Sequence, residues 1–242
     1  MSEQDEIIVL KEIDYKDYDK ILHCFSKKRG RIQVMARGAQ KSNSENMSIA
    51  QTFNYCDVTL IQNKEMFILI NGSVLNSFYR LRQKYENYVY GSYILEILNH
   101  VLQENDHQAN AFEMTVRMLE VLEDVSANIS WYIHAYEIKL ISMMGFKPQL
   151  EHCAVCGAAR PRHIKFSISE GGIICNSCGV MKDSSLTTQE SINDMFKLLY
   201  VKFEHIATIK EINIEALKLI RKYFNAYVGK EQFKSLKLLE FK

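Results

Sequence analysis

The chain has 242 residues, of which 47% are hydrophobic and 24% are charged, with a formal net charge of +1. This composition is that of a globular protein with one or two domains, and no apolar run approaches the roughly 18 residues that span a bilayer. The acidic residues 1–6 lack the basic and apolar regions of a secretory signal. We therefore expect a cytosolic, reducing location and no membrane contact. We also expect no small-molecule substrate.

Residues 1–79 are predicted to form a barrel of about five strands. Turn signals at Arg29-Gly30, Gly38 and Asn71-Gly72 separate short runs of residues with high β-propensity. The runs are residues 7–10, 21–25, 31–36, 55–60, 66–70 and 73–75. Their length and spacing are typical of a small closed barrel and favour an OB-fold.

Charged residues are sorted within this segment. Residues 1–19 hold seven acidic and two basic side chains, whereas residues 20–41 hold seven basic side chains and no acidic one. A hairpin over residues 21–37 would present a positive tip that attracts nucleic-acid phosphates, with Phe25 as a possible stacking platform. A solvated basic turn is the alternative. The candidate DNA contacts are Lys20, Lys27, Lys28, Arg29, Arg31, Arg37 and Lys41.

From about residue 80 the hydrophobic period changes to that of helices. Three helices are predicted, over residues 85–102, near 110–122 and 131–141, and the third ends at Gly145 with Pro148 beyond it. Glu137 is an acidic residue on an otherwise apolar helix. It could be a functional acid, but a carboxylate paired with a base is the commoner arrangement.

Two C-x-x-C pairs predict a metal site. Cys153 and Cys156 form the first pair and Cys175 and Cys178 the second, with a short hairpin between them over residues 164–168 and 171–174. This is the spacing of a structural zinc ribbon, in which four thiolates surround one Zn²⁺ ion. The remaining cysteines, Cys24 and Cys56, lie in strand runs and are expected to be small buried apolar groups.

Other uses of the paired cysteines fit less well. Disulfides need an oxidising compartment, and a redox C-x-x-C usually follows a strand in a βαβ pattern. Zinc deaminases use a Pro before the pair and an H-x-E motif upstream, and neither occurs here. A site closed by four sulfurs also leaves no open coordination position, so we expect the metal to stabilise the fold.

The rest of the chain is predicted to be helical. Residues 187–190 have the pattern of a capping box that opens a helix reaching Phe203, a second helix spans 214–228 and closes at Gly229, and the tail 233–241 is amphipathic. The fold class is α+β, a barrel followed by a helical bundle with an inserted ribbon. The expected domains are residues 1–79, 80–150, 151–182 and 183–242.

The order of these features resembles the bacterial recombination mediator family RecO over nearly the whole chain. The stretches that carry the resemblance are residues 8–10, 18–22 leading through Phe25 to Gly30, 35–39, 137–140, 145–148, 153–157 and 236–239. Relatives are usually more basic just after the Ala36-Arg37-Gly38-Ala39 run. Here Gln40 and residues 42–46 are neutral to acidic.

The resemblance implies a non-enzymatic role in DNA repair. It implies an OB-fold that binds single- and double-stranded DNA, annealing of complementary strands, and partnership with RecR and with the acidic tail of single-stranded-DNA-binding protein. It also implies help in loading RecA at gaps. The chain lacks the P-loop, H-E-x-x-H and G-x-S-x-G motifs of common enzymes. A zinc-stapled adaptor that binds RNA or protein is the alternative.

Overall fold

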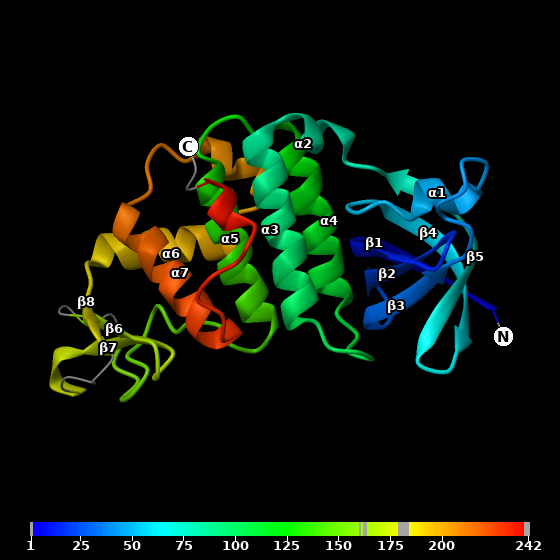
Figure 1. Ribbon diagram of the computed structural model, residues 1–242. Helices are drawn as coiled ribbons and strands as arrows, with labels where there is room; N and C mark the ends of the chain where they lie inside the picture. Colours follow the sequence, from blue (N-terminus) through cyan, green and yellow to red (C-terminus); the bar gives the residue numbers. More distant parts are fainter. Residues whose placement is uncertain (1, 160, 162–163, 179–183, 240–242) are drawn as a thin grey trace. The chain divides into compact units, whose positions relative to one another are not determined.

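The computed structural model describes residues 2–159, 161, 164–178 and 184–239. Two compact units are present, one formed by Met1–Val125 with Gln232–Lys242 and the other by Ser126–Glu231. We call them the first and second unit and describe each by itself (Figure 1). The domain boundaries expected from the sequence stay predictions.

The first unit begins with a closed five-stranded barrel, which confirms the predicted OB-like domain. The strands follow the order β1-β2-β3-β5-β4 around the barrel. Their bounds are β1 Ser2–Tyr15, β2 Asp19–Ser26, β3 Gly30–Ala36, β4 Tyr55–Asn63 and β5 Met66–Asn76, with α1 Glu45–Ile49 between β3 and β4. Alternate residues of β3 are buried, as expected for a strand with one face on a core.

Strand β1 is much longer than the sequence pattern predicts. It starts at Ser2 and pairs with β2 on one side and β4 on the other, with an irregularity between Val9 and Lys11. The sequence pattern shows only residues 7–10 because polar side chains occupy most of the exposed positions elsewhere. The acidic start of the chain is therefore part of the barrel.

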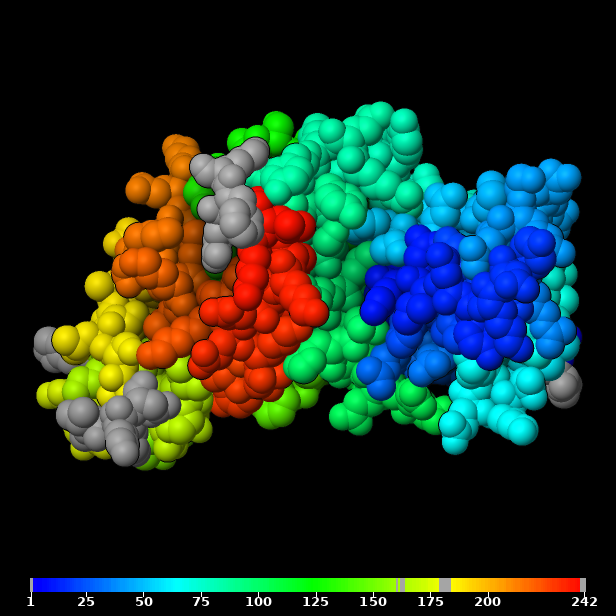
Figure 2. Space-filling view, viewed as in Figure 1, coloured from blue at the N-terminus to red at the C-terminus, as the bar shows by residue number. Residues whose placement is uncertain are grey.

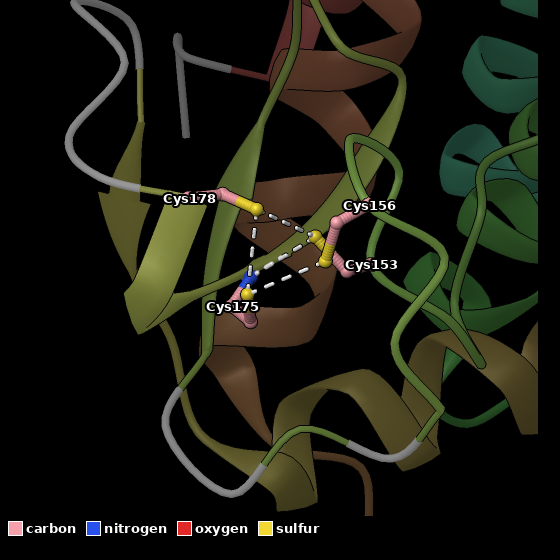
Figure 3. Close-up of side chains that lie close together, drawn as sticks. All are labelled: Cys153, Cys156, Cys175 and Cys178. Carbon is pink, nitrogen blue, oxygen red and sulfur yellow. Dashed lines mark hydrogen bonds between the residues drawn. The ribbon is translucent and has the colours of Figure 1, made fainter.

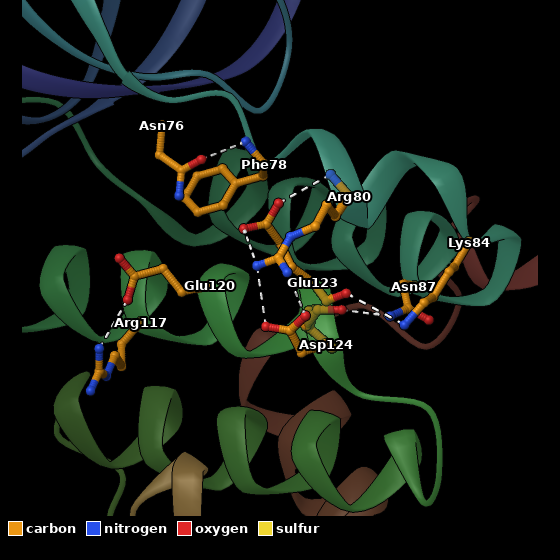
Figure 4. A network of polar contacts seen from close by, with 10 residues as sticks. Asn76, Phe78, Arg80, Lys84, Asn87, Arg117, Glu120, Glu123 and Asp124 are labelled. Carbon is orange, nitrogen blue, oxygen red and sulfur yellow. Dashed lines mark hydrogen bonds and ion pairs between the residues drawn. The ribbon is translucent and has the colours of Figure 1, made fainter.

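Among the described residues of the first unit, three α-helices follow the barrel, α2 Tyr79–Gln83, α3 Tyr85–Val101 and α4 Ala109–Asp124. The structure confirms the predicted helices near residues 85–102 and 110–122, whereas α2 was not predicted. A polar network fixes α2 against the end of α4, because the backbone N–H of Arg80 donates to Glu123 and its guanidinium pairs with Asp124 at 2.9 Å (Figure 4). Nearby, Asn87 donates to the carbonyl of Val125 at 2.9 Å.

The C-terminal segment returns to α3 of the first unit. Glu96 accepts hydrogen bonds from the backbone N–H groups of Lys234 and Ser235, and Tyr93 packs edge-on against Phe233 with 5.0 Å between ring centroids. A short 3₁₀ helix, η3, covers Leu236–Leu239. Residues 240 and 241 of the predicted amphipathic tail lie outside the described residues.

The second unit contains three α-helices among its described residues, α5 Ile129–Met143, α6 Gln189–Tyr200 and α7 Ile214–Val228, with a 3₁₀ segment, η2, at Phe203–Thr208. Helix α6 ends before Phe203, so the predicted helix was too long. The predicted capping box was also displaced by one residue, since Thr188 is the N-cap and accepts from the backbone N–H of Ser191. Gly229 ends α7 in the left-handed conformation, as predicted.

A buried ion pair joins two helices of the second unit. Arg221 on α7 contacts both carboxylate oxygens of Glu137 on α5, at 2.8 Å and 3.2 Å, and the Glu137 side chain is fully buried. Glu137 is therefore paired with a base, which is the alternative that the sequence analysis favoured over a functional acid. A pair with this fork geometry can satisfy a charge that would otherwise be costly to bury.

The ribbon of the second unit is a small sheet in the order β7-β6-β8. Strands β6 Ile164–Ser167 and β7 Gly172–Cys175 form the predicted hairpin, and β8 Ser185–Leu186, which was not predicted, pairs with β6. The ribbon packs on α7, where Tyr227 donates to the carbonyl of Ile168 at 2.9 Å and Tyr223 packs edge-on against Phe166. Residues 179–183 lie outside the described residues.

Within the described ranges, no helix has the length and apolar character needed to cross a lipid bilayer.

Candidate metal centre and nucleic-acid interface

The four paired cysteines converge on one point of the ribbon. Their Sγ atoms all lie within 4.8 Å of one another, with 3.7 Å between Cys153 and Cys178 and between Cys156 and Cys175, and 3.5 Å between Cys175 and Cys178 (Figure 3). Four sulfurs each about 2.3 Å from a central ion would stand about 3.8 Å apart at the corners of a tetrahedron. The cluster therefore has the size that a four-sulfur metal site requires, and these residues could hold a metal ion.

Backbone hydrogen bonds fix the first cysteine pair against β7. The N–H of Gly157 donates to the carbonyl of Cys153 at 2.8 Å, which closes a tight turn, and the N–H of Ala154 donates to the carbonyl of Ile173 at 2.8 Å. The N–H of Cys175 donates to the Sγ atom of Cys153 at 3.3 Å. The thiol positions thus follow from the local fold.

The thiols are strongly linked electrostatically. Desolvation opposes ionisation of Cys153, but backbone N–H groups at Cys156, Cys175 and Val155 outweigh it and lower the pKa of Cys153 to about 6. The neighbouring Cys156 and Cys175 thiols raise the pKa of Cys178. Ionising one sulfur therefore disfavours ionising the next, as expected for thiols that lie this close together.

The other two cysteines have the predicted structural role. Cys24 and Cys56 are both fully buried in the barrel core. Burial raises the pKa of the Cys24 thiol and raises that of Cys56 to about 12. Both thiols therefore stay protonated and act as small apolar groups.

The predicted positive tip lies between β2 and β3, and its cations are largely paired with acids of β1. Lys27 contacts Glu6 at 2.9 Å and Arg29 contacts Asp5 at 2.9 Å, while Arg29 also pairs with Glu3. The antiparallel register, in which Ile7 faces Ser26, brings the acidic residues of β1 alongside the tip. The opposite charges that are separated in the sequence are therefore adjacent in the barrel.

The tip also packs against the connection between α3 and α4. Lys27 has a second acidic partner, Glu113 of α4, at 3.0 Å, and the N–H of Arg31 donates to the carbonyl of Gln103 at 3.0 Å. Gly30 has a φ of +70°, and a Cβ atom there would lie 2.5 Å from the carbonyl oxygen of Asp106. Only glycine fits this contact without a shift of backbone.

Phe25 is not a stacking platform, contrary to the sequence prediction. Its side chain is fully buried, and its ring packs edge-on against Phe112 of α4 with 5.2 Å between centroids. The ring cannot meet a base because it joins the barrel to the helices of the first unit. The alternation of apolar and polar residues along β2 could not show that α4 covers the face of the strand that carries Phe25.

The seven candidate DNA contacts form two groups at opposite ends of β2 and β3. Lys27, Lys28, Arg29 and Arg31 lie at the tip, whereas Lys20, Arg37 and Lys41 lie at the other end. The strand from Lys20 to Ser26 spans about 20 Å. Lys20 pairs with Glu12, and Arg31 lies 3.9 Å from Glu104. In the part of the chain that the structure describes, no ion pair involves Lys28, Arg37 or Lys41, and all three are exposed.

Comparisons with known proteins agree across both units. A family model described as Recombination protein O N terminal matches residues 1–78, and one described as Recombination protein O C terminal matches residues 82–237. A DNA repair protein RecO of Caldanaerobacter subterraneus subsp. tengcongensis is 29% identical over 234 residues, covering 95% of this chain and 94% of the relative.

Two further relatives carry the same description. The DNA repair protein RecO of Desulforamulus reducens is 27% identical over 98% of this chain and 92% of its own length. That of Alkaliphilus metalliredigens is 27% identical over 96% of each chain. Together with the barrel, the helical part and the four-cysteine cluster, these matches assign the chain to the RecO family of DNA repair proteins.

Proposed function

We propose that this chain is a non-catalytic mediator of recombinational repair that binds single- and double-stranded DNA through its barrel. It anneals complementary strands coated with single-stranded-DNA-binding protein, whose acidic tail it contacts, and with RecR it helps to load RecA at gaps. Membership of the RecO family supports this role. The proposed location is the nucleoid in the cytoplasm, where such substrates occur.

The observation that carries the proposal is the set of exposed cations on the barrel. Lys28, Arg37 and Lys41 are exposed and have no ion pair among the described residues, so they can meet phosphates without first breaking one. Phosphates would reach Lys27 and Arg29 only by displacing the carboxylates of Glu6 and Glu3. DNA binding at the tip is therefore an exchange of anionic partners, which lowers its net gain.

We propose Zn²⁺ as the ion held by Cys153, Cys156, Cys175 and Cys178. Four thiolates in a tetrahedron suit zinc, and the observed sulfur separations support this ligand set. A site closed by four protein ligands keeps no position for substrate or water, so the ion would stabilise the ribbon. This arrangement supports a structural rather than a catalytic metal.

Strand annealing tests the proposed function. Two complementary oligonucleotides are coated with single-stranded-DNA-binding protein, and duplex formation is followed with and without the chain. The chain should accelerate annealing at least tenfold, because cations on its barrel reduce repulsion between the two phosphate backbones. No acceleration by a correctly folded chain would refute the proposal.

A matched pair of variants links annealing to the barrel. The barrel variant, Lys28→Glu with Arg37→Glu and Lys41→Glu, reverses three exposed cations without breaking an ion pair. The control variant, Lys202→Glu with Lys210→Glu and Lys222→Glu, makes the same change in net charge on exposed residues of the second unit. Both variants are tested on uncoated strands. Annealing should fall strongly in the barrel variant and stay close to the wild-type rate in the control variant.

A further inference from the structure

An exposed pair of tyrosines lies at the end of the barrel opposite the positive tip. Tyr15 ends β1 and Tyr18 precedes β2, so the two rings flank the turn at Lys16 and Asp17. Their side chains are 37% and 56% exposed, respectively. In the space-filling view the start of the chain, in blue, forms part of the visible surface of the barrel (Figure 2).

A lysine side chain of the barrel contacts each of the two rings. The Nζ atom of Lys16 lies 5.2 Å from the centroid of the Tyr15 ring, and that of Lys41 lies 4.8 Å from the centroid of the Tyr18 ring. These distances are those of cation–π contacts. A cation therefore lies over each ring, and an exposed ring paired with a cation can bind an unpaired base together with its phosphate.

The local fold holds this arrangement in place. The carbonyl of Tyr18 accepts from the N–H of Gln40 at 3.0 Å, and a carboxylate oxygen of Asp19 accepts from the N–H of Gly38 at 2.8 Å. The side chain of Gln40 donates to the carbonyl of Asp19 at 2.9 Å. These bonds join the β1–β2 turn to the loop after β3, so Tyr18 and Lys41 are positioned before any ligand arrives.

Positive charge alone would not hold a nucleic acid at this end of the barrel. Lys16, Arg37 and Lys41 are exposed at this end of the barrel, but so are Asp14 and Asp17. The local charge is therefore mixed, and attraction for phosphates is weaker than for a purely basic surface. Binding at this end should depend mainly on stacking, which needs bases that are not already stacked in a duplex.

We propose that Tyr15 and Tyr18 form a stacking site for unpaired bases, so that this end of the barrel selects single-stranded over double-stranded DNA. The inference rests on the proposed DNA-binding function and adds the form of DNA and the residues that read it. The tyrosines stack on two bases of one strand, while Lys16, Arg37 and Lys41 contact its phosphates.

The test compares single-stranded and duplex oligonucleotides of equal length by fluorescence anisotropy. The stacking variant, Tyr15→Leu with Tyr18→Leu, keeps apolar bulk but removes both flat rings. Since stacking contributes roughly 1–3 kcal/mol per base and the variant removes both rings, it should bind the single strand at least about 30-fold more weakly. Its affinity for the duplex should stay within about twofold of wild type.

Two controls separate stacking from other effects. Tyr15→Phe with Tyr18→Phe keeps the rings and should retain single-strand affinity. Tyr79→Leu removes a more exposed ring from α2, where Tyr79 is 65% exposed, and this variant should also bind normally. Circular dichroism and thermal unfolding of each variant confirm that the barrel is folded before affinities are compared.

The possible outcomes are distinct. If the wild-type chain binds neither oligonucleotide, the proposed DNA-binding function fails. If wild type binds DNA but the stacking variant binds the single strand equally well, the stacking site is wrong and the function stands. Equal loss of single-strand and duplex binding would also overturn single-strand selection. So would the finding that removing the two rings weakens binding of a protein partner and leaves DNA binding unchanged.

Discussion

Arg29 and Asp5 are joined by an ion pair of 2.9 Å, and the Asp5 side chain is completely buried. The pair links the tip between β2 and β3 to β1, so the acidic start of the chain neutralises part of the basic segment that follows it. Arg29 is in turn 5.2 Å from the ring centroid of Phe67. These contacts give Arg29 a structural role in the barrel.

Removing two acids of β1, Glu3 and Glu6, should strengthen DNA binding. Glu3→Gln with Glu6→Gln leaves Arg29 and Lys27 with fewer acidic partners, so phosphates no longer displace those carboxylates. We expect DNA affinity at low salt to rise about threefold to tenfold, consistent with one or two released cations. Anisotropy titration measures it, with exposed Glu65→Gln as the control. An unchanged affinity would show that the tip does not contact DNA.

Removing a cysteine ligand should release the metal and destabilise the ribbon. Metal analysis of the reduced wild-type chain should find one zinc ion per chain, and Cys175→Ser should lose it because three thiolates bind zinc less tightly than four. A chelator should lower the melting temperature of the wild type. Cys24→Ser, outside the cluster, should keep its zinc. Full stability of the wild type after metal removal would contradict a structural role.

Breaking the buried ion pair of the second unit should cost stability. In Arg221→Met the buried carboxylate of Glu137 loses its bidentate partner. The expected loss is about 3 kcal/mol in the free energy of unfolding, measured by urea denaturation. The double variant Glu137→Leu with Arg221→Met should lose less, because no buried charge is left alone. A smaller loss in the single than in the double variant would contradict this account.

Replacing Gly30 should disturb the contact between the tip and the α3–α4 connection. In Gly30→Ala the added Cβ would lie 2.5 Å from the Asp106 carbonyl oxygen and 2.6 Å from that of Gln103. Gly229→Ala is the control, since its φ of +68° is similar but nothing lies within 4 Å of the added atom. Both variants pay for the left-handed backbone, so the extra destabilisation of Gly30→Ala, about 1–3 kcal/mol, reports the clash. Equal unfolding midpoints in the two variants would show that the contact is loose.

Local patterns were sufficient to predict much of the fold. Alternation located the barrel, and the spacing of Cys153, Cys156, Cys175 and Cys178 located the metal site, because both features depend on residues close in sequence. The turn predicted at Asn71-Gly72 was wrong, since both residues lie within β5 and pair with β4. The left-handed cap at Gly229 was visible for the same reason.

The parts that were missed depend on contacts between distant residues. The burial of Phe25 follows from its contact with Phe112, which is far along the chain. The pairing of Lys27 with Glu6 follows from the register of β1 and β2, which composition does not reveal. The sequence did not single out Tyr15 and Tyr18 as a binding feature, because only the structure brings Lys41 onto Tyr18.

The salt dependence of DNA affinity tests the central claim most directly. Binding of the wild-type chain, the barrel variant and the control variant to a duplex is measured at several salt concentrations. Loss of three phosphate contacts should reduce the slope of log affinity against log salt by roughly 2 to 3 in the barrel variant, while the control variant keeps the wild-type slope. Identical slopes and affinities for all three chains would contradict DNA binding through the barrel.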